Sequence, residues 1–472
     1  MKILYVTSEA NPYAASGGLG DVLGALPRTI AKRDGYECAV ILPMYSQIKE
    51  EYRKKMKKVD EFSFYLGWRN LYCGVWSLSE SGVTYYFIDN EYYFKRSSMY
   101  GQYDDGERFA YFSRAVIEVM LRGIYVPDIM HANDWQTALA VEYLKLKYNS
   151  HPTLGRIKAV FTIHNIEYQG KYDMAILENV FDFDYCFKSI FEFDGCINLM
   201  KAAIVSCDRL TTVSPNYANE LKEPFFAFGL HNIIRENSYK FRGIINGIDT
   251  VYFSPENGSD IEYTYNVNSF SEGKANNKMA LQKELGLKVD ANIPMAVMIT
   301  RLTNGKGIDL MLRIFDELMC ENMQFVLLGT GDYGYEDIFR QLCSRHSDKA
   351  RALIKFDRVT SKHMYASADL FIMPSKSEPC GLAQMTACRY GTIPIVRAVG
   401  GLYDTIIPYG APDSVGFTFN NFNAHELLFR IKDALSLYYN KNEWNSLVKR
   451  AMTADFTWES SADKYIDMYN GI

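Results

Sequence analysis

Two positively charged side chains, five positions apart, stand out in the second half of the chain. Arg301 and Lys306 lie in the run Thr-Arg-Leu-Thr-Asn-Gly-Lys-Gly, which follows an apolar strand-like segment and precedes a helical pattern. Arginine offers a planar fork of donors and lysine a point charge, so together they suit a diphosphate. An exposed basic turn is the simpler alternative, and the neighbouring glycines and the strand-end position favour the diphosphate. The Walker pattern G-x-x-x-x-G-K-[ST] is absent.

A second candidate site is an acid followed by a glycine turn. Glu378 stands directly before Pro379, in a run that starts where another predicted strand ends at Met373. We expect a helix to open at Gly381, with unpaired amides that take phosphate oxygens while Glu378 binds hydroxyls. The pattern suits a nucleoside diphosphate-sugar. Cys380 is interpreted as a packed thiol, because no activating His/Asn pair lies near it in the sequence.

A third run, from Gly329 through Gly331 to Gly334, matches the dinucleotide fingerprint G-x-G-x-x-G. That fingerprint belongs to a first βαβ unit, with an acidic residue about 20 positions further on. Here the acid of the next strand, Asp357, comes later, and the motif lies late in its domain. We interpret the run as a nucleotide-sugar loop or a plain turn. A nicotinamide-dependent oxidoreductase is the competing class of enzyme on this motif alone.

In the first half, a glycine-rich loop follows the first predicted strand. Gly17, Gly18 and Gly20 would let the backbone approach a ligand closely and aim amides at it from a helix start. Asp21, in the first turn of that helix, would either cap it or accept hydrogen bonds from sugar hydroxyls. A tight β–α turn without a ligand explains the same residues equally well.

Two further polar groups follow predicted strands in this half. Asp134, in His-Ala-Asn-Asp-Trp, is either a base towards an incoming hydroxyl or merely the N-cap of the next helix. His164 and Asn165 come directly after a strand, which favours a ligand contact over a structural role. A neutral His164 would hydrogen-bond a reacting sugar.

Composition limits the class of protein. The chain has 472 residues, of which 48% are hydrophobic and 23% charged, so disordered and fibrous classes fit poorly. A net charge of −5 argues against a generic nucleic-acid partner, and no apolar run is long enough to span a bilayer. The N-terminus lacks the long apolar region of a signal peptide, and we therefore expect a cytoplasmic protein. Nine cysteines without a C-x-x-C pair, and seven histidines without H-E-x-x-H, predict neither disulfides nor a metal site.

These residues need elements that place them at sheet edges. Strands are predicted at 2–7, 37–42, 84–88, 128–131 and 159–162, helices at 20–32 and 135–147, and a hairpin insertion over 61–89. In the second half, strands are predicted at 295–300, 325–328, 352–356, 370–373 and 393–396, with helices beginning near Gly307, Tyr333, Ser361, Gly381 and Leu402. Apolar strands alternating with helices indicate parallel sheets covered on both faces. The polar segment 249–274 separates two doubly wound α/β domains, which we expect to face each other across a cleft that holds the chemistry.

Several of these motifs, taken in order, resemble one family. The chain carries S-E-A-x-P, G-G-L-G-D-V, H-A-N-D-W, T-I-H-N-I-x-Y-Q-G, T-V-S-P-N-Y-A, N-G-I-D, R-L-T-x-x-K-G, P-S-x-x-E-P-C-G-L and G-G-L-x-D-T. It resembles the bacterial glycogen synthase and plant starch synthase family of retaining glycosyltransferases, which have two Rossmann-like domains in the GT-B fold. The resemblance covers essentially the whole chain.

The resemblance implies a glycogen (starch) synthase that moves glucose from ADP-glucose to the non-reducing end of an α-1,4-glucan. Configuration would be retained, and no cofactor or metal would be needed. Residues 1–250 would form the acceptor-side domain and 251–455 the nucleotide-sugar domain. Residues 456–472 would form a helix that crosses back onto the first domain.

The resemblance also implies roles for particular residues. Arg301 and Lys306 would hold the diphosphate and stabilise its departing charge, while Glu378 would bind glucose hydroxyls. Phe356 would stack on the base. The other implied contacts to donor, glucose or acceptor are Gly17, Gly18, Asp21, Asp134, His164, Asn165, Asn246, Gly329, Gly331, Cys380, Gly381 and Leu382.

Two positions depart from the family pattern. The first loop of the family normally has a lysine, thought to lie near the donor phosphates, where this chain has Ala15, followed by Ser16. Ala383 replaces the usual threonine after E-P-C-G-L. Either another basic residue substitutes, or donor preference shifts towards UDP-glucose, or the chain is a weakly active, glucan-binding paralogue. A non-catalytic glucan-binding scaffold is the competing class outside the enzymes.

Overall fold

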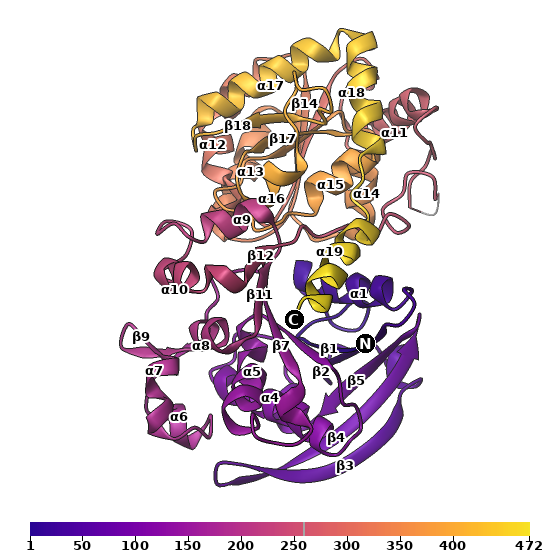
Figure 1. Cartoon of the computed structure of the whole chain (residues 1–472). Helices are drawn as coiled ribbons and strands as arrows, with labels where there is room; N and C mark the ends of the chain where they lie inside the picture. Colours follow the sequence, from indigo (N-terminus) through magenta and orange to yellow (C-terminus); the bar gives the residue numbers. More distant parts are fainter. Residues whose placement is uncertain (258–259) are drawn as a thin grey trace. The chain divides into compact units, whose positions relative to one another are not determined.

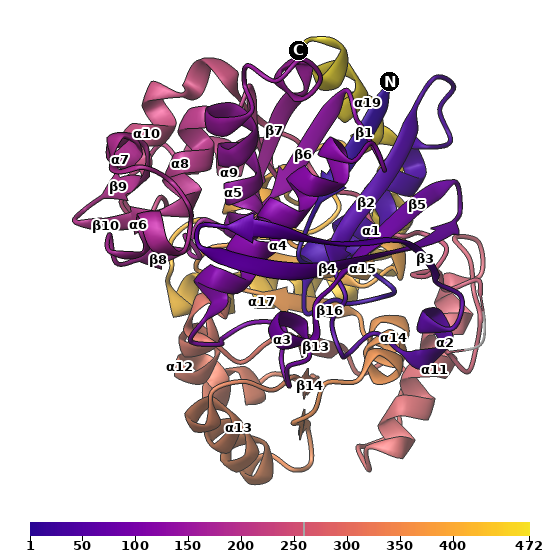
Figure 2. The ribbon, with the colours of Figure 1, turned by 90° about the horizontal axis from the view of Figure 1, so that it is seen from below.

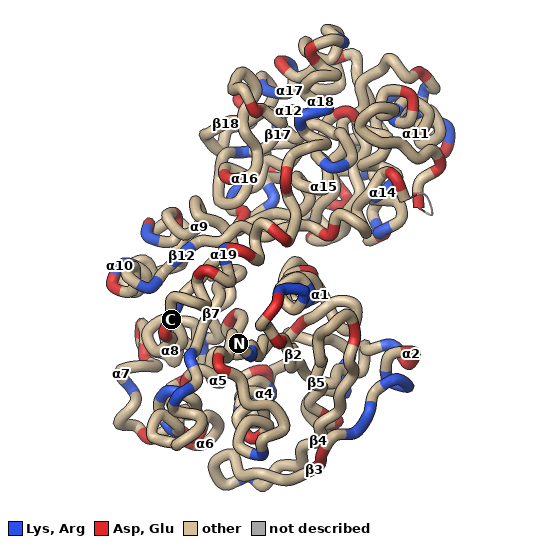
Figure 3. Tube along the Cα trace, turned by 45° about the vertical axis from the view of Figure 1, so that its right-hand side comes forward, with Lys and Arg blue, Asp and Glu red and all other residues tan. Residues whose placement is uncertain are grey.

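The computed structural model describes residues 1–257 and 260–472, which form two compact units (Figure 1). Unit 1 is Met1–Ile244 with Trp458–Ile472, and unit 2 is Ile245–Thr457. The chain therefore changes unit at 244/245 and 457/458, whereas the family resemblance implied boundaries at 250/251 and 455/456. Basic and acidic residues are interspersed along both units (Figure 3).

Unit 1 is built on a nine-stranded sheet of order β12-β11-β7-β6-β1-β2-β5-β4-β3. Its strands are β1 (Lys2–Val6), β2 (Glu37–Pro43), β3 (Lys57–Leu66), β4 (Arg69–Glu80), β5 (Val83–Asp89), β6 (Ile129–Asn133), β7 (Lys158–Ile163), β11 (Arg209–Thr212) and β12 (Phe241–Gly243). Pairing is parallel from β12 to β5 and antiparallel for β4 and β3. The insertion expected over 61–89 is thus only the hairpin β3–β4, because β5 pairs with β2 as a regular sheet strand.

The helices of unit 1 are α1 (Gly18–Ile30), α2 (Glu50–Arg53), α3 (Glu91–Phe94), α4 (Asp105–Leu121), α5 (Ala138–Glu142), α6 (Ile176–Asn179), α7 (Lys188–Phe191), α8 (Leu199–Ser206), α9 (Pro215–Glu220), α10 (His231–Glu236) and α19 (Trp458–Asn470). Helices α4 and α5 lie across one face of the sheet, and α1 and α19 lie on the other (Figures 1 and 2). A small sheet of β8 (Lys171–Tyr172), β10 (Cys196–Asn198) and β9 (Glu192–Phe193), absent from the sequence prediction, lies between α5 and α8 in the chain.

The helical stretch predicted over 135–147 is confirmed, although the type of helix changes along it. A 3-10 turn spans Trp135–Thr137, α5 follows, and Tyr143–Lys147 is a π-helical turn. Asp134, directly before this stretch, has a φ of 58°, and the chain turns there as it leaves β6.

Unit 2 has a six-stranded parallel sheet of order β15-β14-β13-β16-β17-β18. Its strands are β13 (Met295–Ile299), β14 (Gln324–Leu328), β15 (Ala350–Leu353), β16 (Leu370–Met373), β17 (Ile393–Arg397) and β18 (Phe417–Phe419). Its helices are α11 (Phe270–Glu284), α12 (Ile308–Met319), α13 (Tyr333–Arg345), α14 (Arg358–Ser367), α15 (Ala383–Arg389), α16 (Gly400–Thr405), α17 (Ala424–Tyr438) and α18 (Lys441–Thr453). The strand order reverses beside β13, the usual place for a ligand in a doubly wound sheet.

Two expectations for unit 2 need correction. The third strand ends at Leu353 rather than 356, which leaves Phe356 in a loop. The helix expected to open at Gly381 begins two residues later, at Ala383. Gly381 has a φ of 72°, a left-handed conformation that cannot belong to an α-helix.

The last helix, α19, is part of unit 1. It packs against α1, and the hydroxyl of its Tyr469 lies 2.7 Å from Nδ1 of His131 in the sheet. No helix among the described residues is both long enough and apolar enough to cross a membrane.

Candidate active site

In unit 2, loops after β13, β14 and β16 hold one another at the carboxyl edge of the sheet. The N–H of Leu302 donates to Thr330 O at 3.0 Å, and the N–H of Asp332 donates back to Leu302 O at 2.8 Å. The N–H of Lys376 donates to Gly305 O at 2.9 Å. The loop that carries Arg301 and Lys306 is therefore fixed on both sides by its neighbours.

The glycines of these loops are required by close packing. A Cβ on Gly331 would lie 2.3 Å from Leu302 O, and one on Gly329 would lie 1.9 Å from Thr300 O. Gly307 has a φ of 70°, and its Cβ would lie 2.0 Å from Pro374 O. Contact between two loops thus accounts for the first two glycines of the apparent dinucleotide fingerprint, which favours the plain-turn interpretation.

Lys306 and Glu378 form an ion pair. Nζ of Lys306 lies 2.7 Å from Oε2 of Glu378, and the two side chains are 20% and 8% exposed. The buried hydroxyl of Ser375 donates to the same oxygen at 2.9 Å. The sequence predicted separate roles, phosphate for Lys306 and sugar hydroxyls for Glu378. The structure brings the two together, so that each retains hydrogen-bonding capacity beyond the pair.

Arg301 is exposed, and its guanidinium forms no hydrogen bond or ion pair with any residue in 1–257 or 260–472. Its backbone is fixed, since Leu302 next to it is fully buried. This cation is therefore held in position at the sheet edge while its donors remain unused, as an anion-binding side chain requires.

Cys380, Asn246 and Gly381 lie together in unit 2. Burial raises the pKa of the Cys380 thiol to about 12, and hydrogen bonds from Asn246 offset this only partly. The thiol is therefore protonated at neutral pH, in keeping with a packed thiol. The side-chain oxygen of Asn246 is buried and has no hydrogen-bond partner among the described residues. Gly381 O accepts from Nε2 of Gln384 at 2.9 Å, and Leu382 precedes the first helical residue.

Phe356 is 79% exposed on the loop before α14. Asp357 next to it caps this helix, because its carboxylate accepts the N–H groups of Val359 and Thr360 at 3.0 and 3.1 Å. The ring of Phe356 is thus presented by a capped helix start and remains accessible to a planar ligand.

In unit 1, Asp134 and His164 come together. Oδ1 of Asp134 accepts the N–H of His164 at 2.7 Å and that of Asn165 at 3.4 Å. Asp134 occupies the N-cap position of the following 3-10 turn, but its side chain makes no capping hydrogen bond there. Burial raises the pKa of the Asp134 carboxyl to about 7.

The tautomer of His164 follows from its partner. The amide of Asn133 donates to Val6 O and His131 O, so its Oδ1 is an acceptor, and it lies 2.9 Å from Nε2 of His164. Nε2 of His164 therefore carries the proton and Nδ1 can accept one. Burial lowers the pKa of His164 to about 3, which keeps the ring neutral. Sequence reasoning gave Asn133 no role, although it belongs to the motif that contains Asp134.

The glycine loop of unit 1 folds around Glu9, a buried acid. Its carboxylate accepts the N–H and the hydroxyl of Ser16, both at 2.6 Å, and the hydroxyl of Tyr100 at 2.7 Å. Gly17 precedes α1 and Gly18 begins it, while Asp21 accepts a hydrogen bond from Asn11. Glu9 and Tyr100 were missed, although Glu9 is part of the S-E-A-x-P motif.

Known proteins agree with this arrangement. Residues 2–236 match the family model of the starch synthase catalytic domain, and residues 282–451 match that of group 1 glycosyl transferases. Two doubly wound units with polar side chains at their sheet edges, together with these matches, define a glycosyltransferase of the GT-B fold.

Individual relatives narrow the class. The chain is 47% identical to a glycogen synthase of Clostridium botulinum (strain Eklund 17B) over 99% of both chains, and 46% identical to that of Bacillus subtilis over 98% and 97%. The starch synthase IV catalytic domain of Arabidopsis thaliana, solved bound to ADP and acarbose, superposes with a TM-score of 0.91 at 33% identity over 99% and 98%. A sucrose-phosphate synthase of Thermosynechococcus elongatus, with a TM-score of 0.63 at 16% identity over 100% and 98%, shares the fold. The chain belongs to the bacterial glycogen synthase family.

Proposed function

We propose that this glycosyltransferase transfers glucose from ADP-glucose to the non-reducing end of an α-1,4-glucan with retention of configuration. The observation that carries the proposal is the loop after β13, which holds both Arg301, whose guanidinium has no partner among the described residues, and Lys306, which pairs with Glu378. Membership of the glycogen synthase family supports glucan as acceptor. The starch synthase relative solved with ADP supports adenosine diphosphate as the leaving group.

In this proposal unit 2 binds the donor. As the glycosidic bond breaks, negative charge grows on the departing diphosphate, and fixed cations stabilise it without reorganising. Arg301 supplies two parallel donors and Lys306 a third. Glu378 already holds Lys306, and its carboxylate accepts hydroxyls of the glucose.

In unit 1, the proposal gives His164 and Asp134 roles towards the acceptor side. A neutral His164 accepts a sugar hydroxyl proton at Nδ1, since Asn133 occupies its other nitrogen. Asp134 holds the backbone of the His164 loop through two N–H groups. Its pKa of about 7 lets it take a proton near neutral pH.

The test compares ADP-glucose and UDP-glucose side by side, with glycogen as primer. We expect release of ADP and incorporation of labelled glucose that β-amylase removes again as maltose, because that enzyme cleaves only α-1,4 links from the non-reducing end. Glucose is α-linked in the donor, so an α-linked product means that the configuration at the anomeric carbon is retained. Glucan binding without nucleotide release would refute transfer.

A second candidate donor is UDP-glucose. The observation that favours it is Ala15, where the family pattern has a lysine. Higher turnover with UDP-glucose than with ADP-glucose in the same assay would establish it.

We also propose that transfer needs no metal or cofactor and takes place in the cytoplasm. EDTA is then expected to leave the turnover number unchanged, and a loss that added Mg²⁺ restores would contradict this.

A further inference from the structure

The loop between α9 and α10 in unit 1 has a backbone conformation that bulky residues rarely adopt. Phe228 in this loop has a φ of 47°, and Gly229 after it has a φ of 95°. A large side chain in the left-handed region costs free energy, so such a conformation persists only where the surroundings impose it. The strained residue is not buried, since Phe228 is 47% exposed.

Two residues close to Phe228 in the loop are buried. Ala227 and Leu230 are fully buried, and Gly229 lies against the ring of Phe193, which would be 3.6 Å from a Cβ at that position. Phe225, 64% exposed, packs edge-on against Phe226 with ring centroids 5.0 Å apart. The loop thus buries Ala227 and Leu230 and leaves the side chains of Phe225 and Phe228 largely exposed.

One buried amide holds the strained residue. Nε2 of Gln169, which is 3% exposed, donates to Phe228 O at 3.2 Å and to Ile166 O at 3.1 Å. Oε1 of Gln169 accepts from Nδ2 of the fully buried Asn198 at 2.7 Å. Ile166 lies two residues after His164. A single nitrogen therefore ties the backbone of Phe228 to the loop that carries His164.

The link between Phe228 and the loop of His164 suggests that the exposed phenyl ring binds a sugar. The faces of a glucose ring carry axial C–H groups and are apolar, while its edge carries hydroxyls, so a glucan stacks on an exposed aromatic ring beside polar groups. Two phenyl rings cover far less than the roughly 800 Å² per partner of a stable protein interface. One glucose unit of a glucan chain, already the proposed acceptor, is small enough to bind on an aromatic surface of this size.

We propose that Phe228 binds a glucose unit of the acceptor glucan away from the reacting end. Gln169 is the positioning residue that fixes this ring relative to the His164 loop. The inference rests on the proposed function, because it names a subsite for the acceptor of that reaction.

The decisive variant is Phe228→Gly. Glycine adopts a φ of 47° without strain, so the fold is kept and the melting temperature is expected to stay equal or rise. Loss of the ring is expected to raise KM for maltoheptaose about three- to ten-fold, the range of an aromatic stacking contact. The turnover number at saturating primer and KM for the nucleotide-sugar should not change. Phe228→Trp should restore the wild-type KM, since it returns an aromatic face.

The matched control is Tyr239→Ala. Tyr239 is an aromatic residue of the same unit and is 82% exposed, but no hydrogen bond links it to the His164 loop in the described chain. Its loss should leave KM for maltoheptaose unchanged. An unchanged KM in Phe228→Gly, or an equal rise in both variants, would overturn the subsite. So would a changed oligomeric state of Phe228→Gly in size-exclusion chromatography at unchanged KM, which would mark a protein contact.

A binding measurement separates this inference from the proposed function. Glycogen cast into a native gel retards a protein that binds it, whether or not glucose is transferred. Less retardation of Phe228→Gly than of Tyr239→Ala supports the subsite even if the wild type releases no nucleotide, and equal retardation refutes it.

Discussion

Arg301 and Lys306 are cations of one loop in different surroundings. Arg301 has no partner among the described residues, whereas Lys306 neutralises the buried carboxylate of Glu378. Removing the Arg301 side chain therefore leaves no group without its partner, while removing that of Lys306 leaves the buried negative charge of Glu378 without its cation. The two substitutions should differ in their effect on stability although both remove a charge from the same site.

We expect Arg301→Ala to lower the turnover number about 100-fold or more, with unchanged thermal unfolding, because a lost donor to developing charge costs that much. Lys306→Ala should lower turnover similarly and also destabilise the fold by about 2 kcal/mol. Steady-state kinetics and urea unfolding measure both. Arg313→Ala is the control, since that side chain is 66% exposed on α12 and pairs with Glu317 on the same helix. Near-wild-type turnover of Arg301→Ala would refute the diphosphate role.

Asp134 gives a second prediction, this time about pH. Its pKa rises from 3.8 to about 7 on folding because the carboxyl is buried. Between those values the folded chain keeps a proton that the unfolded chain has lost, so this group's contribution to stability falls as pH rises from about 4 to about 7. Activity that needs the ionised form should rise over pH 6 to 8.

Asp134→Asn keeps an oxygen that accepts the N–H of His164 but cannot titrate. We expect its melting temperature to vary less between pH 5 and 8 than that of the wild type, and the rise in kcat/KM centred near pH 7 to disappear. The same pH–rate curve in variant and wild type would show that Asp134 takes no proton in the reaction.

At the scale of elements, the unit 2 site depends on loops that touch. Gly307 both has a left-handed backbone and lies against Pro374 O, whereas a Cβ on Gly334 would meet no atom within 4 Å. Gly307→Ala should therefore destabilise the protein by about 3 kcal/mol, combining strain and collision. Gly334→Ala should be nearly neutral. Urea unfolding of the pair tests this, and equal stabilities would show that the loops do not need this contact.

The strands of unit 2 could be predicted because each is a short apolar run between polar segments. The bounds of β16 agree with the predicted 370–373. The start of α15 could not be predicted, because it depends on the left-handed turn at Gly381 and not on an apolar pattern. The helical stretch predicted over 135–147 was confirmed, but its change from a 3-10 turn through an α-helix to a π-helical turn could not be read from apolar periodicity.

Residue types at strand ends were enough to nominate Arg301, Lys306 and Glu378 from the sequence. The ion pair between Lys306 and Glu378 could not be predicted in this way. The two residues are 72 positions apart and meet because β13 and β16 are neighbours in the sheet. Asn133 and Glu9 were missed because each acts on another site residue, through hydrogen bonds that appear only after folding.

For the whole molecule, the C-terminal helix completes unit 1. The hydroxyl of Tyr469 donates to that of Tyr5 at 3.1 Å and lies 2.7 Å from His131, whose other nitrogen lies 2.6 Å from the hydroxyl of Thr162. All these groups are buried, so the chain of hydrogen bonds joins α19 to three strands of the sheet.

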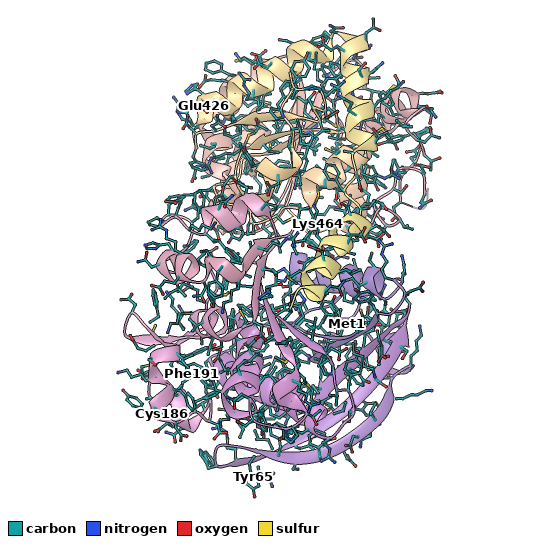
Figure 4. All side chains as sticks on the ribbon, in the orientation of Figure 1. Met1, Tyr65, Cys186, Phe191, Glu426 and Lys464 are labelled. Atoms are coloured by element: carbon teal, nitrogen blue, oxygen red, sulfur yellow. The ribbon has the colours of Figure 1, made fainter. Side chains whose placement is uncertain are left out.

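Tyr469→Phe breaks this chain of hydrogen bonds and leaves buried groups without a partner. We expect a loss of about 1–3 kcal/mol in the free energy of unfolding. Lys464→Ala, on the exposed side of the same helix, is the control and should change stability little (Figure 4). A loss as large for Lys464→Ala would mean that the effect is not specific to the buried network, because alanine favours a helix at least as well as lysine.

The two passages of the chain out of unit 1 and back into it run side by side. The N–H of Ile248 donates to Phe456 O at 2.8 Å, so the ends of unit 2 are neighbours. Unit 2 is thus an insertion between two segments of unit 1, and the first and last residues of the insertion lie close together. The coding region for 245–457 can thus be exchanged with that of a relative as one cassette. A graft that changes nucleotide preference would place its origin in unit 2, whereas an unchanged preference would point to Ala15 in unit 1.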